Sequence, residues 1–169
     1  MVMNFRPVRR QDRILDEKKA RRLLDQGEYG VLSMHGANGY GYGIPISYVT
    51  EAQHLYFHGA PDGFKLDSLV LDNRVSFCVV GATQVIPRQF TTAYESVLLF
   101  GRVTVVTDDV ERVHALRLLS AKYSPEFPEL AEKYIGVSLH RTVILRFDIE
   151  HLSGKTKRVA HPAADPGYK

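Results

Sequence analysis

Short strand-like segments, several of them joined by tight turns, dominate this sequence and limit the folds open to it. β-Branched and aromatic residues or apolar–polar alternation mark residues 29–34, 44–50, 53–58, 74–80, 96–106 and 142–152. The first three segments follow one another closely, which is typical of an antiparallel meander. The pattern therefore predicts a mainly β fold, an antiparallel barrel with outer helices, rather than a doubly wound parallel sheet.

Three helices are predicted between the strands, at residues 16–26, 64–71 and 110–122. Gly27 provides a stop for the first helix, and Pro125 and Pro128 are expected to end the region that follows the last one. Gly101 lies inside the longest strand segment, where a glycine predicts a bulge or a close approach of two backbones.

The length of 169 residues suits a single domain, which we take as residues 1–169 with extended tails at 1–12 and 159–169. A single cysteine, Cys78, excludes an internal disulfide framework and fits a reducing, cytoplasmic compartment. No apolar run is long enough for a membrane span, and we expect no signal peptide. The net charge of +3 is too small to indicate nucleic acid; the basic residues near each end suit solvated tails, or an anion bound beside one tail.

The sequence contains no catalytic or metal-binding motif of a familiar kind. No serine lies in a strand-turn-helix elbow, and there is no Walker or dinucleotide fingerprint. The glycines between residues 36 and 43 are better explained by a hairpin than by a phosphate-binding loop. His54 and His58 are four residues apart on a predicted strand, a separation that suits zinc poorly, so we predict no metal site.

The most informative stretch runs from Leu55 to Lys65, where a predicted strand meets a glycine-rich turn and then the start of a helix. Free backbone N–H groups at a helix start, with a lysine beside them, are typical of an anion site. A plain strand-to-helix connection with a surface lysine explains the same residues. The pattern alone therefore leaves both interpretations open.

Residues 55–77 resemble the FMN-phosphate segment of the pyridoxamine-phosphate-oxidase-like split barrels. In that family small residues end a strand, a lysine or arginine follows, and then come a leucine, an Asn-Pro-like turn and a Val-Ser-Leu or Val-Ser-Phe strand. The matching positions here are Gly59, Ala60, Lys65, Leu69, Asp72-Asn73 and Val75-Ser76-Phe77. Ser68 and Asp72-Asn73 depart from the usual Asn and Asn-Pro, which affects the turn but leaves the lysine in place.

Other segments extend the resemblance over residues 9–158. Residues 28–33 and 42–48 are similar to the first two barrel strands. Residues 90–97, 100–101 and 149–155 are similar to the subgroup related to 5-nitroimidazole-resistance (Nim) flavoproteins. The resemblance implies an antiparallel six-stranded split β-barrel of the FMN-binding type that forms a homodimer.

The same resemblance implies FMN as the cofactor, held in a groove between two subunits. The residues expected to contact it are Ile46, Ser47 and Tyr48 along the isoalloxazine edge; His58, Gly59 and Ala60 beside the ribityl chain and phosphate; Lys65 at the phosphate; and Tyr94, Glu95, Ser96 and Val97 from the second subunit. His58 would either bind the cofactor or donate a proton to a substrate during catalysis.

By this resemblance the chain is a flavin-dependent reductase or oxidase of small molecules, and the Nim subgroup points to nitroimidazole reduction. One alternative is pyridoxamine-phosphate oxidase itself, although its arginine-rich end is not evident here. Another is a non-catalytic flavin- or haem-binding module, since His35, His54 and His58 offer axial ligands for haem. Neither a membrane nor nucleic acid is an expected partner.

Overall fold

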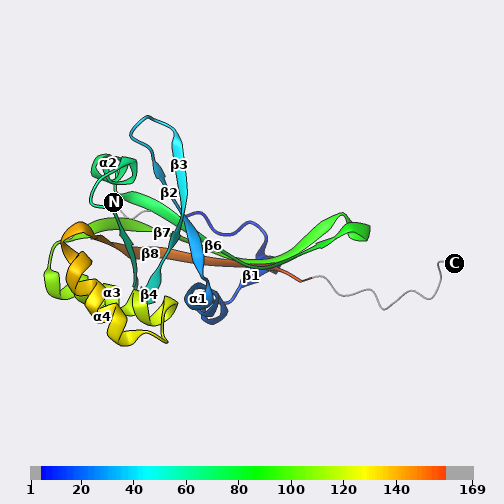
Figure 1. Ribbon diagram of the computed structural model, residues 1–169. Helices are drawn as coiled ribbons and strands as arrows, with labels where there is room; N and C mark the ends of the chain where they lie inside the picture. The colour runs from blue at the N-terminus through cyan, green and yellow to red at the C-terminus, as the bar shows by residue number, and fades with distance from the viewer. Residues whose placement is uncertain (1–4, 159–169) are drawn as a thin grey trace.

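The computed structural model describes residues 5–158. Within them, eight strands form one sheet and four α-helices lie around it (Figure 1). The strands are β1 (Ile14–Leu15), β2 (Tyr29–His35), β3 (Gly41–Ser47), β4 (Val49–Glu51), β5 (His54–Gly59), β6 (Arg74–Ile86), β7 (Thr91–Val106) and β8 (Val143–Lys157). The helices are α1 (Glu17–Gln26), α2 (Phe64–Leu71), α3 (Asp109–Tyr123) and α4 (Pro128–Ser138), with short 3₁₀ turns at Gln11–Arg13, Pro87–Gln89 and Leu139–Arg141. In this described part, no helix is long and apolar enough to cross a membrane.

The strands form one antiparallel sheet in the order β3-β2-β6-β7-β8-β5-β4, and β1 pairs with the end of β8. The mainly β, antiparallel split-barrel fold with outer helices is therefore confirmed. The described residues form eight strands rather than six, because the short β1 and β4 are added. The hydrogen-bonded sheet stays open, with β3 and β4 as its end strands.

The predicted meander of residues 29–58 is wrong. β2 pairs with β3, with Tyr29 opposite Ser47, but the chain then turns at Tyr48 and β4 pairs with β5 instead. The Tyr48 side chain is fully buried, and its hydroxyl donates a hydrogen bond to the carbonyl oxygen of Leu24. This buried anchor fixes the corner between β3 and β4, so that one residue connects the two ends of the sheet.

Inward-facing residues of the long strands form the main core, in which Phe57, Phe77 and Phe147 are fully buried. The ring centroid of Phe57 lies 5.3 Å from that of Phe77 and 6.5 Å from that of Phe147, within the range of favourable aromatic pairing. α1 packs on this core through Ala20 and Leu24. A second cluster joins α3 and α4 to β5 and β8, and both helices lie at one end of the sheet (Figure 1).

α1 and α3 each begin directly after a capping aspartate. The Asp16 side chain accepts a hydrogen bond from the Lys19 backbone N–H (3.0 Å), and Asp108 accepts one from the Glu111 N–H (2.9 Å). Both helices match the predicted segments within a few residues. Pro128, however, begins α4 rather than ending a helical region, because a proline at the first helical position loses no hydrogen bond.

Gly101 lies at an irregularity in the sheet, as the sequence predicts. The register between β7 and β8 shifts between Phe100 and Gly101. An ideal Cβ atom on Gly101 would overlap the backbone carbonyl oxygen of Asp148. The two strands can therefore approach this closely only where one of them carries glycine.

β6 and β7 continue past the body of the protein as a two-stranded ribbon, drawn in green and projecting away from α3 and α4 (Figure 1). We call residues 82–94 the arm. Its strands pair with each other from Thr83 opposite Tyr94 to Ile86 opposite Thr91, and β8 reaches only Tyr94 in the described chain. The predicted strands 74–80 and 96–106 omit the arm, because its residues lack the alternation that burial on one face imposes.

The structure describes part of the predicted N-terminal tail but not the C-terminal one. Within the N-terminal one, the ring of Phe5 stacks 4.7 Å from His151 and 5.5 Å from Phe100, so this segment packs on the sheet. Residues 159–169 lie outside the described part of the chain.

Candidate functional site

Residues 59–65, between β5 and α2, are the predicted anion site, and we call this segment the cradle. β5 ends at Gly59, and α2 begins after Gly63, which has a φ of 117° and provides no side-chain cap. Lys65 lies in the first turn of α2, and an ideal Cβ on Gly59 would come within 2.6 Å of the Lys65 Nζ atom. The lysine ammonium therefore lies directly over the Gly59 backbone, where any side chain would displace it.

The charges of this cradle are unbalanced. Lys65 is half-buried, and no carboxylate among residues 5–158 lies within ion-pairing distance of it. Burial lowers the pKa of Lys65, and burial together with the nearby Lys65 charge lowers the pKa of His58. His58 keeps solvent contact although protein surrounds it, which places it at the mouth of the cradle. A bound anion would stabilise both groups.

The residues expected along the isoalloxazine edge divide into two kinds. Ile46 and Ser47, at the end of β3, are half-buried: Ser47 lines a hollow, whereas Ile46 packs against the main core. The side chain of Tyr48 is fully buried in the core, so only its backbone could contact a bound ring. β3 contacts the start of α2 at its other end, where the ring centroids of Tyr42 and Phe64 lie 4.9 Å apart.

Two residues near Ser47 belong to this region but were not predicted from the sequence. Tyr123, the last residue of α3, accepts a hydrogen bond from the Tyr48 backbone N–H (2.9 Å) and lies 2.6 Å from the Glu28 carbonyl oxygen as a donor. The Lys122 ammonium lies 4.0 Å from the centre of the Tyr48 ring, and burial lowers its pKa.

Lys122 and Tyr123 line a hollow of about 560 Å³, together with Ser47, Asp25 and Glu28. The C-terminal end of a helix 75 residues away in the sequence thus borders the predicted site. No local pattern signals this contact, because the predicted helix at 110–122 stops one residue short of Tyr123 and its partners lie in distant segments.

The segment Tyr94–Val97 lies far from the cradle of its own chain. Gly59 pairs with Val143 at the start of β8, whereas Val97 pairs with Gly154, eleven residues farther along that strand. At about 3.3 Å per residue the two positions are roughly 35 Å apart. Val97 is also fully buried, so its side chain cannot face a ligand, while Tyr94, Glu95 and Ser96 are half-exposed. One chain therefore does not bring this wall and the cradle together.

The three histidines considered as haem or metal ligands have different neighbours. His54 Nδ1 lies 2.7 Å from Asp148, and His58 lies near Lys65. His35 lies near Asp72, whose pKa is lowered chiefly by its hydrogen bonds from Arg74 and only to a minor extent by His35. Residues 5–158 contain no group of histidine, cysteine or acidic side chains arranged to hold a metal ion.

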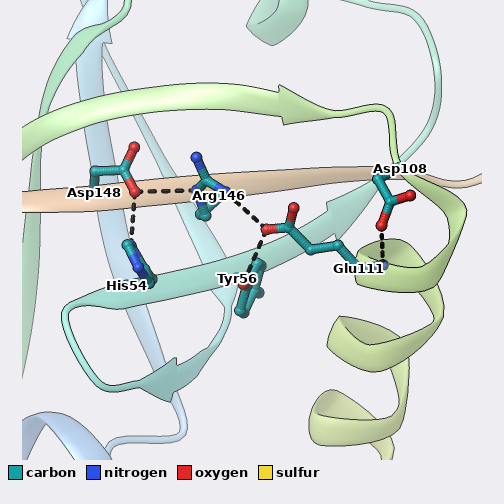
Figure 2. Close-up of polar contacts among 6 residues, drawn as sticks. All are labelled: His54, Tyr56, Asp108, Glu111, Arg146 and Asp148. Atoms are coloured by element: carbon teal, nitrogen blue, oxygen red, sulfur yellow. Dashed lines mark hydrogen bonds and ion pairs between the residues drawn. The ribbon is translucent and has the colours of Figure 1, made fainter.

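His54 instead ends a polar chain that connects the sheet to α3 (Figure 2). Arg146 lies between two carboxylates, donating to Asp148 (3.1 Å) and to Glu111 of α3 (2.9 Å). The buried Tyr56 donates to the same Glu111 oxygen at 3.0 Å, and desolvation with the Glu111 charge raises the pKa of Tyr56 to about 12. We interpret this network as structural, because its central groups are already paired with one another.

The sequence matches a known protein family, and the fold is similar to that of several solved structures. The family model described as pyridoxamine 5'-phosphate oxidase matches residues 16–156. No curated protein matches in sequence. Among solved structures, an inferred 5-nitroimidazole antibiotic resistance protein of Bacteroides thetaiotaomicron superposes with a TM-score of 0.71 at 19% identity, covering 85% of this chain and 86% of that one.

Two further neighbours share the fold. A FAD-binding protein of Mesorhizobium loti has a TM-score of 0.64 at 22% identity and covers 86% of this chain and 98% of that one. A FAD- and haem-binding protein of Mycobacterium smegmatis has a TM-score of 0.71 at 19% identity and covers 88% and 75%. At these identities the likeness establishes the fold, while the family model covers most of the sequence. The chain therefore belongs to the pyridoxamine 5'-phosphate oxidase family, in its split-barrel fold.

Proposed function

We propose that this chain binds FMN and acts, as a homodimer, as a flavin-dependent oxidoreductase of small molecules. The observation that carries the proposal is the half-buried Lys65 ammonium, held over Gly59 at the uncapped start of α2 without a carboxylate partner in the described chain. A phosphate monoester satisfies the lysine and the free N–H groups of the first helical turn together. The family match and the FAD-binding neighbours support a flavin as the molecule that carries this phosphate.

The separation within one chain supports the homodimer part of the proposal. Tyr94, Glu95 and Ser96 lie on the order of 35 Å or more along β8 from the cradle, too far to contact the same flavin. A second copy can present this segment to the cradle of the first. The proposed site then has Lys65, Gly59, Ala60, Ile46 and Ser47 from one copy and the Tyr94–Ser96 wall from the other.

Bound FMN would supply hydride or electron transfer, and the protein would supply position and environment. Lys65 holds the phosphate, and Gly59 leaves the space that the phosphate needs. Burial and the Lys65 charge lower the pKa of His58, which disfavours its charged form, so a hydrogen bond to the phosphate or ribityl chain suits it better than proton donation. We therefore assign His58 to cofactor binding, and the Lys122–Tyr123 hollow beside Ser47 to exclusion of water from the ring.

Small nitro compounds are the first substrates to test, since one structural neighbour is linked to 5-nitroimidazole resistance. The single cysteine agrees with a reducing cytoplasm as the site of action. Nothing in the cradle favours pyridoxamine phosphate over other reducible or oxidisable molecules, so that compound serves as the comparison substrate.

The test is a titration of the purified protein with FMN, FAD and riboflavin, followed by flavin fluorescence and the visible spectrum. We expect FMN to bind more tightly than riboflavin and the bound flavin to be reduced by NADH or NADPH and reoxidised by a nitroimidazole. A protein that binds none of the three flavins would overturn the proposal. A Soret band after addition of haem, with no flavin binding, would favour the haem-binding alternative.

A further inference from the structure

The outer face of the central strands is apolar at the root of the arm. Val31, Cys78 and Leu98 form a row across β2, β6 and β7, in which Cys78 pairs with both of the others. The row faces outward, because side chains alternate along a strand and the next residues in sequence lie in the core. Val80, two residues closer to the arm, is 62% exposed. None of these four side chains belongs to a core cluster of the described chain, so they can contact another surface.

A hollow of about 400 Å³ opens on this face, and we call it the root hollow. Leu23, Val31, Cys78 and Val80 form its apolar lining, and Glu28 is the one charged residue of the described chain that borders it. A cavity of about 150 Å³ already accommodates a benzene ring, so the root hollow has room for two branched aliphatic side chains. It lies at the α1 end of β2, whereas α2 lies at the other end of that strand (Figure 1).

α2 presents apolar side chains that no part of the described chain covers. Val70 is 85% exposed and Leu71 is 71% exposed, and neither belongs to a core cluster within residues 5–158. The opposite side of the helix is held in place, because the buried Ser68 hydroxyl accepts a hydrogen bond from the Ala37 backbone N–H (3.0 Å). The helix therefore cannot turn to bury Val70 and Leu71, and their exposure points to a contact outside the chain.

The separation between the Tyr94–Ser96 wall and the cradle determines where a two-fold axis can pass. On β8 the wall pairs with residues 155–157 and the cradle begins opposite Val143, so the level midway between them is Ile149. An axis that crosses the strands at this level carries the wall of one copy to the cradle of the other, whereas an axis parallel to the strands leaves the two apart. Ile149 pairs with Gly101 of β7, and Gly101 pairs with Val75 of β6.

We propose that the dimer packs face to face about this axis, and that Val70 and Leu71 of each copy occupy the root hollow of the other. Cys78 lies three residues from Val75 in one direction, and Asp72, which directly follows α2, lies three residues from it in the other. At about 3.3 Å per residue both lie roughly 10 Å from the axis, so the rotation brings the end of α2 opposite Cys78. The interface is isologous, because one rotation makes both contacts.

The same contact brings the wall to the cradle. Ser96 of the wall pairs with Val80, which lines the root hollow, so wall and hollow are neighbours. Lys65 lies in the first turn of the helix whose last residues enter the hollow, and α2 is only about 12 Å long. Insertion of Val70 and Leu71 therefore holds the cradle of one copy beside the wall of the other.

The area available suits a stable dimer. From the level of Val80 to that of Arg74 the four strands β2, β6, β7 and β8 measure about 20 Å by 19 Å, roughly 400 Å². A stable dimer buries about 800 Å² on each partner, so the exposed side of α2 and the wall, which lie beyond this area, have to supply the remainder.

This inference rests on the homodimer of the proposed function but not on flavin binding. The single native cysteine makes it testable, because Cys78 lines the root hollow. In Val70→Cys or Leu71→Cys, oxidised glutathione should join the new thiol to Cys78 of the second copy, since disulfides form across a Cα separation of about 4.4–6.8 Å. We expect a covalent dimer on a non-reducing gel for at least one of the two variants, with and without FMN. The wild type should stay monomeric on that gel, because its two Cys78 residues lie about 20 Å apart along the sheet.

Two matched variants control the experiment. Leu71→Cys combined with Cys78→Ser should stay monomeric on the gel, and Phe90→Cys, at the exposed tip of the arm, should not cross-link to Cys78. A covalent dimer in the Cys78→Ser background would mean that the two α2 helices meet each other, and would overturn the inference. So would a cross-link from Phe90→Cys to Cys78, or no cross-link from either α2 position in a protein that sedimentation equilibrium shows to be a dimer.

A second measurement does not depend on thiol chemistry. Val70→Asp should raise the dimer dissociation constant at least about 100-fold, because each dimer would bury two unpaired charges, and Val80→Lys in the same chain should restore most of the affinity. Val110→Asp, at a similarly exposed position of α3, should leave the dissociation constant unchanged. An unchanged constant in Val70→Asp, a loss that Val80→Lys does not repair, or a wild type that is monomeric at micromolar concentration would overturn the arrangement.

Flavin titration of the same proteins keeps the two proposals apart. Flavin binding together with an unchanged dissociation constant in Val70→Asp would leave only the cradle standing. A dimer that Val70→Asp breaks, but that binds no flavin, would leave only the interface.

Discussion

Substitution of Lys65 tests the cradle most directly, because it removes the ammonium while a methionine retains most of the apolar stem. A charge-assisted hydrogen bond contributes about 1.5–3 kcal/mol, and each 1.4 kcal/mol changes affinity tenfold. We therefore expect Lys65→Met to weaken FMN binding by about 10- to 150-fold. Riboflavin lacks the phosphate, so its affinity should change less than threefold. The ratio of the two effects isolates the contact between Lys65 and the phosphate from any general disturbance of the site.

The structure also predicts the behaviour of the flavin-free variant. Burial lowers the pKa of Lys65, so the charge costs stability in the free protein and its removal should leave the thermal midpoint equal or higher. Lys122→Met is the matched control, since Lys122 is also half-buried with a lowered pKa but belongs to the hollow beside Ser47. Fluorescence titration and thermal unfolding supply both readouts. Equal losses for FMN and riboflavin, or the same selective loss in Lys122→Met, would refute the assignment of Lys65 to the phosphate.

Three further substitutions, at Gly59, His58 and Tyr56, test the cradle and the polar network at α3. Gly59→Ala should reduce the preference for FMN over riboflavin, because the added Cβ would lie 2.6 Å from the Lys65 Nζ and displace it; the same flavin titration checks this, and an unchanged preference would contradict the close contact. A bound phosphate should raise the lowered pKa of His58, so FMN affinity should fall as the pH rises through the pKa that His58 has in the complex. His58→Gln should flatten that dependence, and riboflavin should lack it in both proteins. Since the pKa of Tyr56 is raised to about 12 from an unfolded value near 10, its contribution to stability is complete below pH 10 and is lost between pH 10 and 12. Denaturant unfolding should therefore show a smaller alkaline decline for Tyr56→Phe than for the wild type, and identical declines would exclude Tyr56 as a cause.

The sequence predicts the parts of this protein that local patterns determine. The helix at 16–26 has an aspartate cap and a glycine stop, and the cradle is a contiguous run from Leu55 to Lys65. Both are present in the structure at the expected residues. The break at Tyr48 is not visible in the sequence, because the residues from 44 to 50 keep one strand-like pattern while their partners change from β2 to β5.

The other differences between the sequence-based predictions and the structure depend on contacts between distant segments. Lys122 and Tyr123 reach the site only because α3 packs its C-terminal end against the corner at Tyr48. The arm escapes prediction for the opposite reason: its side chains pack on nothing in the described chain, so no burial pattern marks it. Sequence patterns therefore identify the cradle, whereas the surroundings of Ser47 depend on which distant segments meet.

The position of β8 in the sheet has a consequence for synthesis of the protein. β8 is the last strand described, yet it pairs with β1, β5 and β7. A ribosome that adds about 5–20 residues per second needs roughly 5–20 s to proceed from Gly59 to Lys157. The apolar strand β5 has an open edge throughout that interval, and one side of β7 is open from the completion of Val106 onward; other chains can extend both edges. A nascent chain halted before residue 143 would therefore present two unpaired strand edges to chaperones, and to other copies of itself.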